Sequence, residues 1–350
     1  MNDLSSDKIS FTNLIDDVVD QNRCVACGAC DAVCPVNVIK LDNFVPTLTG
    51  DCIECGICYN NCPRTDFDDQ TLEESIHGRT RNEGERLTGV YSEVYAAKAI
   101  PSDIQERAQD GGVVTALVSQ FLDEGGDAVI VAGLDEERPW LPKPVVARAR
   151  KEVVQAAGTK YTPSPTLLGL KKAVKEDKLE KVAVVGTPCQ MRGLTRLTIG
   201  PMKNVKYRDA VDLKVGLFCM ETFSHDSFIE YLGENDVDPA NVTKFEIKKG
   251  RFYAHAGEER LHRARLKKVK GLIRSCCDQC EDFASEYADI SVGNVASPPG
   301  YSTVLVRTER GKQALESAIK SGLIEAGPIE DFEKGETLVH KLAEMKKSSH

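Results

Sequence analysis

Eight of the thirteen cysteines in this sequence form two copies of one motif. Cys24, Cys27, Cys30 and Cys34 precede Pro35, and Cys52, Cys55, Cys58 and Cys62 precede Pro63. Both copies have the C-x2-C-x2-C-x3-C-P spacing that binds [4Fe–4S] clusters, because soft thiolates suit iron. In two-cluster ferredoxins the fourth cysteine of each run ligates the other cluster. The spacing therefore predicts one cluster on Cys24, Cys27, Cys30 and Cys62, and a second on Cys34, Cys52, Cys55 and Cys58. A structural zinc site is disfavoured, since zinc takes ligands in two pairs.

The other five cysteines are Cys189, Cys219, Cys276, Cys277 and Cys280. Cys189 follows a predicted strand, Cys219 ends another, and Cys277 and Cys280 form a C-x-x-C pair. Cysteines at strand ends and in loops could converge on one more [4Fe–4S] cluster. The spacing leaves two alternatives open, namely buried structural thiols and a redox disulfide between Cys277 and Cys280.

Two polar loops could approach a phosphate group. Gly111 and Gly112 open a predicted helix, where free backbone N–H groups and the helix dipole favour an anion. Residues 158–164 form a second polar loop before a helix. A plain helix start is the favoured interpretation of the first loop, and a simple N-cap would explain the second as well. The sequence has neither a G-x-G-x-x-G motif after a strand nor a P-loop, so a standard dinucleotide fold is not supported.

The chain is acidic, with a formal net charge of −9 and a pI of about 5.4. This balance disfavours nucleic-acid binding, which needs a basic surface. No apolar stretch is long enough to span a membrane, and the N-terminus has no secretory signal pattern. We therefore expect a cytoplasmic protein whose cysteines bind metal or take part in catalysis. Residues 248–274 reverse the charge locally, which indicates either a solvated strand face or a cradle for an anionic ligand or partner.

Hydrophobic periodicity divides the 350 residues into five parts. They are an N-terminal amphipathic helix (1–22), a two-cluster ferredoxin-type domain (23–64), a polar linker (65–88), an α/β domain (89–340) and a C-terminal tail (341–350). The α/β domain alternates predicted strands and helices, which indicates a mixed or mostly parallel sheet. The predicted strands are 90–98, 127–133, 144–149, 181–187, 211–219, 288–293 and 303–308. The predicted helices are 112–124, 164–176, 189–197, 225–233 and 310–321.

The α/β part resembles the family of coenzyme F420 hydrogenase and dehydrogenase beta subunits. The resemblance spans residues 89 to about 310 and rests on an ordered set of motifs. They are Gly111-Gly112-Val113-Val114-Thr115-Ala116, Gly158-Thr159-Lys160-Tyr161, Gly186-Thr187-Pro188-Cys189-Gln190, Gly216-Leu217-Phe218-Cys219, Cys277-x-x-Cys280-x-Asp282-Phe283 and Ala288-Asp289-Ile290-Ser291-Val292-Gly293. With ferredoxin runs in front, the arrangement is most similar to the branch that provides the electron-input subunit of archaeal F420H2 dehydrogenases.

The resemblance implies an FAD in the α/β domain, with Gly111, Gly112, Thr115, Lys160 and Ser164 near it. It also implies a third [4Fe–4S] cluster on Cys189, Cys219, Cys277 and Cys280. The chain departs from the family pattern at two places. Cys276 stands beside Cys277 and could replace it as a ligand, and Asp110 stands where the family has a small residue.

The implied activity is oxidation of reduced coenzyme F420, because a flavin accepts a hydride and releases electrons singly to iron–sulfur clusters. The implied partner is a complex-I-like membrane complex reached through other subunits, or a soluble ferredoxin. The alternatives are a free ferredoxin:coenzyme F420 oxidoreductase, a non-enzymatic polyferredoxin-type carrier and a chlorophyll-pathway reductase of the same family. No acid or base stands out in the sequence, and His225, His255 and His262 are read as solvated. Arg263, Arg265, Lys267 and Lys268 are expected to attract the anionic tail of the coenzyme.

Overall fold

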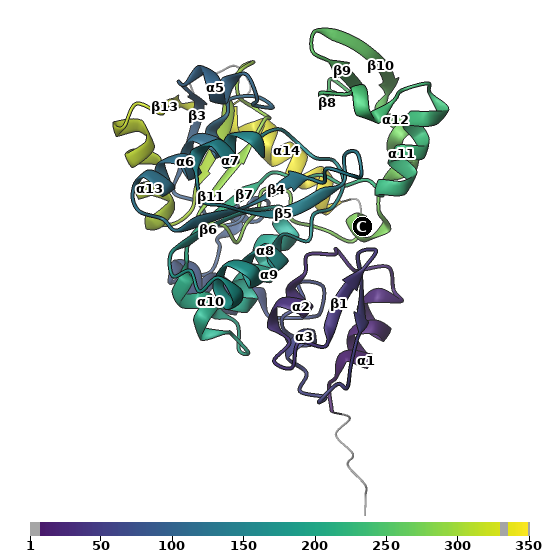
Figure 1. Cartoon of the computed structure of the whole chain (residues 1–350). Helices are drawn as coiled ribbons and strands as arrows, with labels where there is room; N and C mark the ends of the chain where they lie inside the picture. The colour runs from purple at the N-terminus through teal and green to yellow at the C-terminus, as the bar shows by residue number, and fades with distance from the viewer. Residues whose placement is uncertain (1–7, 330–334, 349–350) are drawn as a thin grey trace, which may run out of the picture.

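An eight-stranded mixed sheet forms the centre of the larger domain in this computed structural model (Figure 1). The structure describes residues 8–329 and 335–348. The strand order is β13-β3-β12-β11-β7-β6-β4-β5. The four central strands β11, β7, β6 and β4 run parallel, and the strands on either side pair antiparallel. The bounds are β3 Glu93–Ala99, β4 Ala128–Leu134, β5 Pro142–Ala147, β6 Val182–Gly186, β7 Val211–Leu217, β11 Ile290–Gly293, β12 Ser302–Val306 and β13 Ile324–Pro328.

Helices cover both faces of this sheet, which explains why its central strands are apolar on both sides. In β4, Ile130 packs with α8 and α9 on one face, while Val129 and Val131 pack with α6 and α7 on the other. The predicted α/β architecture with a mixed sheet is therefore confirmed. The helices are α5 Ser102–Gln105, α6 Val113–Asp123, α7 Arg150–Gln155, α8 Thr166–Lys171 continued by η3 Lys172–Glu176, α9 Pro188–Ile199, α10 Val205–Ala210 and α13 Glu309–Lys320.

The N-terminal domain is built from the two cysteine runs and one small hairpin. Helix α2 (Ala29–Val33) and helix α3 (Ile57–Asn60) begin inside the runs, and β1 (Ile39–Asp42) pairs with β2 (Val45–Leu48). Before them, α1 (Phe11–Leu14) and η1 (Ile15–Val19) bury Phe11, Leu14 and Val18 against the domain. This is the predicted amphipathic helix within 8–22, and residues 1–7 of that prediction lie outside the described residues.

A separate three-stranded antiparallel sheet contains most of the basic stretch. Its order is β10-β9-β8, with β8 Lys244–Lys248, β9 Arg251–Ala256 and β10 Glu259–Arg265. Helix α11 (His225–Glu234), η4 (Pro239–Asn241), helix α12 (Leu266–Val269) and η5 (Lys270–Leu272) complete this unit, which stands apart from the large sheet in Figure 1. Its core is aromatic, because Phe223, Phe228, Phe245 and Phe252 pack together. The predicted strands do not include these three, because charged residues obscure their alternation, although a solvated strand face was one interpretation of residues 248–274.

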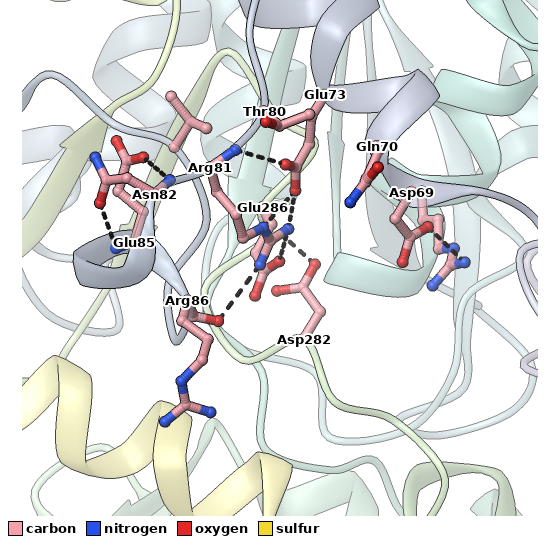
Figure 2. A network of polar contacts seen from close by, with 12 residues as sticks. Asp69, Gln70, Glu73, Thr80, Arg81, Asn82, Glu85, Arg86, Asp282 and Glu286 are labelled. Atoms are coloured by element: carbon pink, nitrogen blue, oxygen red, sulfur yellow. Dashed lines mark hydrogen bonds and ion pairs between the residues drawn. The ribbon is translucent and has the colours of Figure 1, made fainter.

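Residues 65–88, expected to be a linker, fold onto the α/β domain. Helix α4 (Asp69–His77) buries Leu72 and Glu73, and η2 (Glu83–Glu85) follows it. Figure 2 shows Arg81 between Glu73 and Glu286. Its guanidinium pairs with Glu73, and its Nη2 lies 2.6 Å from a carboxylate oxygen of Glu286. Buried ion pairs thus hold this polar segment in place, and the local periodicity of the sequence does not reveal them.

The end of the chain also differs from its prediction. Helix α14 (Gly335–Lys347) takes in most of the expected tail at 341–350, and residues 349–350 lie outside the described residues. Val339 and Ala343 are buried against Phe283 and Leu305. Lys347 pairs with Glu286 at 3.3 Å, so the helix joins the same polar network as Arg81. No helix of the described residues is long and apolar enough to cross a membrane.

Candidate metal centres and cofactor site

The structure gathers the eight N-terminal cysteines around two cavities. The first pocket, with an empty volume of about 350 Å³, is lined by Cys24, Cys27, Cys30 and Cys62. The second pocket, of about 310 Å³, is lined by Cys34, Cys52, Cys55 and Cys58. These are the two sets that the crossed motif predicts, with the fourth cysteine of each run delivered to the other pocket.

Each run curls around its pocket through residues in the left-handed region. Gly28 and Gly56 cap helices α2 and α3 with φ of 88° and 68°, and Ala26 and Glu54 have φ of 56° and 51°. Such turns expose backbone N–H groups on the inside of the loop. One of them, Glu54 N–H, donates to Cys52 Sγ at 3.4 Å. N–H groups directed at sulfur favour the thiolate form, which is the metal ligand.

Burial makes thiolates costly in these pockets unless a cation binds them. It raises the pKa of Cys58 to about 12 and of Cys62 to about 11. Burial also raises the pKa of Cys27 well above its usual range, and the nearby Cys62 raises it further. A bound iron cluster supplies the compensating positive charge, so an all-thiol, apolar-walled pocket fits a [4Fe–4S] group. Among the described residues, no three His, Cys, Asp or Glu side chains are grouped to hold a single metal ion.

The other cysteines meet at the carboxyl edge of the parallel strands. Cys189 follows β6 and lies in the first turn of α9, and Cys219 follows β7. Because β6 and β7 run parallel, their carboxyl ends emerge side by side. The short η6 (Ser275–Cys277) brings in Cys277 and Cys280 from a third segment. Burial raises the pKa of Cys219 well above its usual range, and the charges of Cys277, Cys189 and Cys280 raise it further, so the four thiols are near one another.

Cys276 and Cys277 have different roles in this group. The Cys276 thiol donates a hydrogen bond to Cys277, which raises the pKa of Cys276 and lowers that of Cys277 to about 5. Thr222 N–H approaches Cys277 Sγ at 3.4 Å and supports the thiolate as well. Cys276 is 3% exposed, and this burial adds to the rise of its pKa. The chemistry of this pair favours Cys277 as the ligand.

The residues expected near a flavin occupy the same edge of the sheet. Strand β3 runs parallel to β11, so the loop that leads from it to Gly111 and α6 emerges at the same edge of the sheet as the Cys189 and Cys219 loops. Thr159 N–H donates to Gln109 Oε1 at 3.3 Å, which joins the 158–164 loop to the loop before Gly111. Gln190 Nε2 donates to Ser164 O at 2.6 Å and links that loop to the turn that contains Cys189.

These residues do not all indicate a ligand. A Cβ at Gly111 would lie 2.6 Å from Ser302 N, so close packing between strands already requires glycine there. Gly112 has φ of 71° and caps α6, whose first turns contain the buried Thr115. Lys160 Nζ bonds the carbonyls of Ala157 and Gly158 at 3.0 Å, and burial lowers its pKa to about 8.

Ser164 fits a cofactor better than the glycines do. It is 6% exposed, and its hydroxyl has no hydrogen-bond partner among the described residues. A buried hydroxyl without a partner is costly, so a polar group of a bound molecule would satisfy it. Burial raises the pKa of Asp110, and the nearby Lys244 and Lys248 of β8 lower it by less. Asp110, which stands where the family has a small residue, therefore has cationic neighbours.

Arginines that no sequence pattern predicts hold the two domains together at the cluster loops. Arg196 of α9 is 1% exposed and donates to Cys62 O at 2.6 Å, Thr65 O at 2.9 Å and Asn60 O at 2.6 Å. Arg274 donates to Cys24 O at 3.0 Å. In the other direction, Arg64 donates to Gln279 O at 2.6 Å, inside the C-x-x-C loop. No sequence motif marks these residues, because each one bonds to backbone carbonyls far along the chain.

The predicted basic residues lie at the outer strand of the small sheet. Arg263 and Arg265 end β10, and Lys267 and Lys268 follow in α12; all four are exposed. Strand β8 is the one that reaches the flavin candidates, since Gln109 donates to Phe245 O at 3.1 Å. The histidines have local partners: His225 bonds Pro139 O at 3.0 Å, His262 bonds the Tyr231 hydroxyl at 2.9 Å, and His255 lies 3.9 Å from Glu246.

Comparison with known proteins agrees with this geometry. Two family models described as "Coenzyme F420 hydrogenase/dehydrogenase, beta subunit" match this chain, the N-terminal one at residues 94–171 and the C-terminal one at residues 179–332. A third model, a 4Fe-4S dicluster domain, matches residues 23–66. The beta subunit of the coenzyme F420 hydrogenase of Methanothermobacter thermautotrophicus is 39% identical over 75% of this chain and 93% of its own length. A subunit of the F420H2 dehydrogenase of Methanosarcina mazei is 29% identical over 96% of this chain and 92% of its own.

A solved structure supports the same assignment. A chain of the F420-reducing [NiFe] hydrogenase complex from Methanosarcina barkeri is 37% identical and superposes with a TM-score of 0.71, over 75% of this chain and 91% of that one. The N-terminal domain is accordingly a [4Fe–4S] dicluster domain, and the relatives are subunits of F420-linked oxidoreductases. This chain belongs to the family of coenzyme F420 hydrogenase/dehydrogenase beta subunits.

Proposed function

We propose that this protein is the electron-input subunit of an F420-dependent oxidoreductase that oxidises reduced coenzyme F420. When bound, an FAD would accept the hydride, and [4Fe–4S] clusters would pass its two electrons on singly. The α/β domain would hold the flavin near Ser164 and a cluster on Cys189, Cys219, Cys277 and Cys280. The dicluster domain would then deliver electrons to a partner, either subunits of a complex-I-like membrane complex or a soluble ferredoxin.

The observation that carries this proposal is the continuity of the three cysteine sets. Arg64, two residues after Cys62, donates to Cys276 O at 3.3 Å and to Gln279 O at 2.6 Å, so the third set adjoins the first pocket. Cys30 lines the first pocket and Cys34, four residues later, lines the second, so these two pockets adjoin each other. Leu167 N–H donates to Cys27 O at 3.0 Å and fixes the two domains at this junction. A flavin beside the third set would therefore begin a linear route from the α/β domain to the end of the dicluster domain.

The chain's own side chains stabilise this route. Arg196, Arg274 and Arg64 hold the cluster loops of one domain against the other through backbone carbonyls. Lys346 Nζ donates to Cys277 O at 2.9 Å, so α14 closes over the third set. Cations of this kind, buried or half-buried, favour reduction of a nearby cluster, because reduction adds negative charge.

Anaerobic purification followed by iron, flavin and activity assays tests the proposal. Three cubane clusters contain about twelve irons per chain. We expect bound FAD and reduction of an artificial dye by reduced coenzyme F420. Cys277→Ser with Cys280→Ser should remove one cluster and leave about eight irons, whereas Cys276→Ser should leave about twelve. An intact protein with about eight irons would overturn the third cluster, and a protein without flavin would favour a simple electron carrier.

We also propose that the basic strip of Arg263, Arg265, Lys267 and Lys268 attracts the phosphate and glutamate tail of the coenzyme. The strip is exposed in an otherwise acidic chain, although it lies two strands from the flavin candidates. Arg263→Glu with Arg265→Glu should raise KM for the coenzyme and leave dye-linked kcat nearly unchanged, and added salt should shrink the effect. An unchanged KM together with weaker partner binding would assign the strip to a partner instead.

A further inference from the structure

The face of the dicluster domain around the second pocket is unusually apolar for exposed surface. Among the described residues, five of the eleven exposed large hydrophobic side chains belong to the first 53 residues, namely Ile9, Val36, Val45, Leu48 and Ile53. Val36 and Ile53 line the second pocket itself, with exposed fractions of 42% and 53%. Ile9 lies beside Gly56, which also lines this pocket, because a Cβ at Gly56 would lie 3.4 Å from the Cγ2 of Ile9. Exposed apolar side chains gathered in one place mark an interaction surface.

Acidic side chains border this apolar face. Asp51 and Glu54 flank Cys52 and Ile53 and are exposed. The described part of the chain gives neither carboxylate an ion-pair partner within 4.0 Å. An apolar centre with a charged rim is the usual anatomy of a protein interface. The unpaired negative rim complements a partner that is positively charged around its own contact face.

The first pocket is instead held against the α/β domain. Arg274 and Leu167 of the α/β domain bond to the backbone of its cysteine loop, and Arg196 bonds to Cys62. An electron acceptor can therefore approach a cluster of this domain at the second pocket, which lies farthest from the third cysteine set along the proposed route.

We infer that the cluster-two face, defined as Ile9, Val36, Asp51, Ile53 and Glu54, docks a one-electron redox protein with a basic rim around its redox centre. The inference rests on the proposed function and adds to it the surface and the charge of the partner. The reduced cluster gives one electron to the oxidised centre of the partner, so one oxidised cluster and one reduced partner result. A small apolar face suits a weak, transient redox encounter.

Horse cytochrome c, a basic one-electron protein, is the probe, and its succinylated form is the charge-reversed control. The holoprotein is reduced with dithionite, freed of reductant by anaerobic gel filtration and mixed with each cytochrome in a stopped-flow instrument. This assay does not involve coenzyme F420, so its outcome is independent of whether the proposed substrate is right. Clusters that reduce and reoxidise while the coenzyme fails as donor would refute the proposed substrate and leave the docking face standing.

Asp51→Lys with Glu54→Lys should lower the second-order rate with native cytochrome c about tenfold at low salt and raise the rate with the succinylated form. Ile53→Ser should lower both rates about threefold, because the apolar contact does not depend on charge. The matched controls are Glu136→Lys with Glu137→Lys for charge, and Ile319→Ser on α13 for apolar exposure; all three side chains are exposed and lie outside the dicluster domain. These controls should change neither rate.

Iron content and the dithionite-reduced spectrum of every variant establish that its clusters are intact. The inference is overturned if the Asp51/Glu54 variant keeps the wild-type rate with native cytochrome c. It is equally overturned if the control variants slow the reaction as much as the Asp51/Glu54 variant does, since any surface charge would then attract the cytochrome equally well. Loss of the charge effect in about 0.5 M salt supports electrostatic docking at this face.

Discussion

The two pockets of the dicluster domain have the same motif and different surroundings. Each cysteine loop has two residues in the left-handed region, one of which is a glycine that caps a helix. Each pocket is lined by three cysteines of one run and one of the other. The first pocket faces the α/β domain and contacts Arg196, Arg274 and Leu167. The second is bordered by Ile9, Phe11 and exposed side chains. On the proposed route, the motif decides which group is bound, and the neighbouring elements decide what that group exchanges electrons with.

The largest effect should come from removing one pocket at a time. Cys27→Ala removes a ligand of the pocket next to Cys189, so the second cluster should stay oxidised when reduced coenzyme F420 is added. Cys55→Ala removes a ligand of the outer pocket, so the first cluster should still become reduced. Electron paramagnetic resonance of anaerobically reduced samples measures both, with dithionite-reduced samples showing the surviving cluster. Equal reduction of the surviving cluster in both variants would contradict a linear order.

The next effect is on stability, and it compares the loss of a buried arginine with the loss of a more exposed one. Arg196 is buried and makes four hydrogen bonds to carbonyls of the dicluster domain, so Arg196→Met leaves these acceptors unpaired. We expect a loss of about 3 kcal/mol in the free energy of unfolding. Arg192 on the same helix is more exposed and pairs with Asp69 at 2.7 Å, so Arg192→Met should cost less than about 1 kcal/mol. Anaerobic guanidinium denaturation compares the two, and equal midpoints would show that the carbonyl contacts contribute little.

The same contrast shows what the sequence could predict. Both cysteine runs and the central strands were identifiable, because cluster ligation needs fixed local spacing and buried parallel strands are continuously apolar. The gathering of Cys189, Cys219, Cys277 and Cys280 needed the sheet, since three distant segments supply them. Arg196 and Arg274 had no signal at all, because they bond to backbone groups whose position only the fold determines. The order of residues 65–88 likewise rests on Arg81 and its buried carboxylates, which a polar composition conceals.

Equivalent glycines in the two loops should give smaller and different effects. Gly28 and Gly56 both need positive φ, which costs an alanine about 1 kcal/mol. A Cβ at Gly28 would also lie 2.9 Å from Leu168 Cγ, whereas at Gly56 it would lie 2.9 Å from Ile9 O. Gly28→Ala should therefore loosen the contact between the domains, and Gly56→Ala only the start of α1. Hydrogen exchange should quicken at the Leu167 amide in the first variant and at residues 11–14 in the second; the reverse pattern would contradict the assignment.

The smallest expected effect is on the reduction potentials. Arg274 places a cation at Cys24, beside the first pocket, while Asp51 and Glu54 place anions beside the second. Reduction adds an electron, so a nearby cation raises a cluster's potential and a nearby anion lowers it. Arg274→Gln should lower the first potential by about 40 mV, the equivalent of about 1 kcal/mol for one electron. Glu54→Gln should raise the second potential by less, because solvent screens an exposed charge. Redox titration followed by electron paramagnetic resonance measures each potential separately, with Arg265→Gln on β10 as a remote control. Arg274→Gln keeps a donor for the Cys24 carbonyl, so a fall in potential confined to the first cluster reports the lost charge. An equal fall in the potentials of both clusters would show that the surroundings of the two pockets are electrostatically alike.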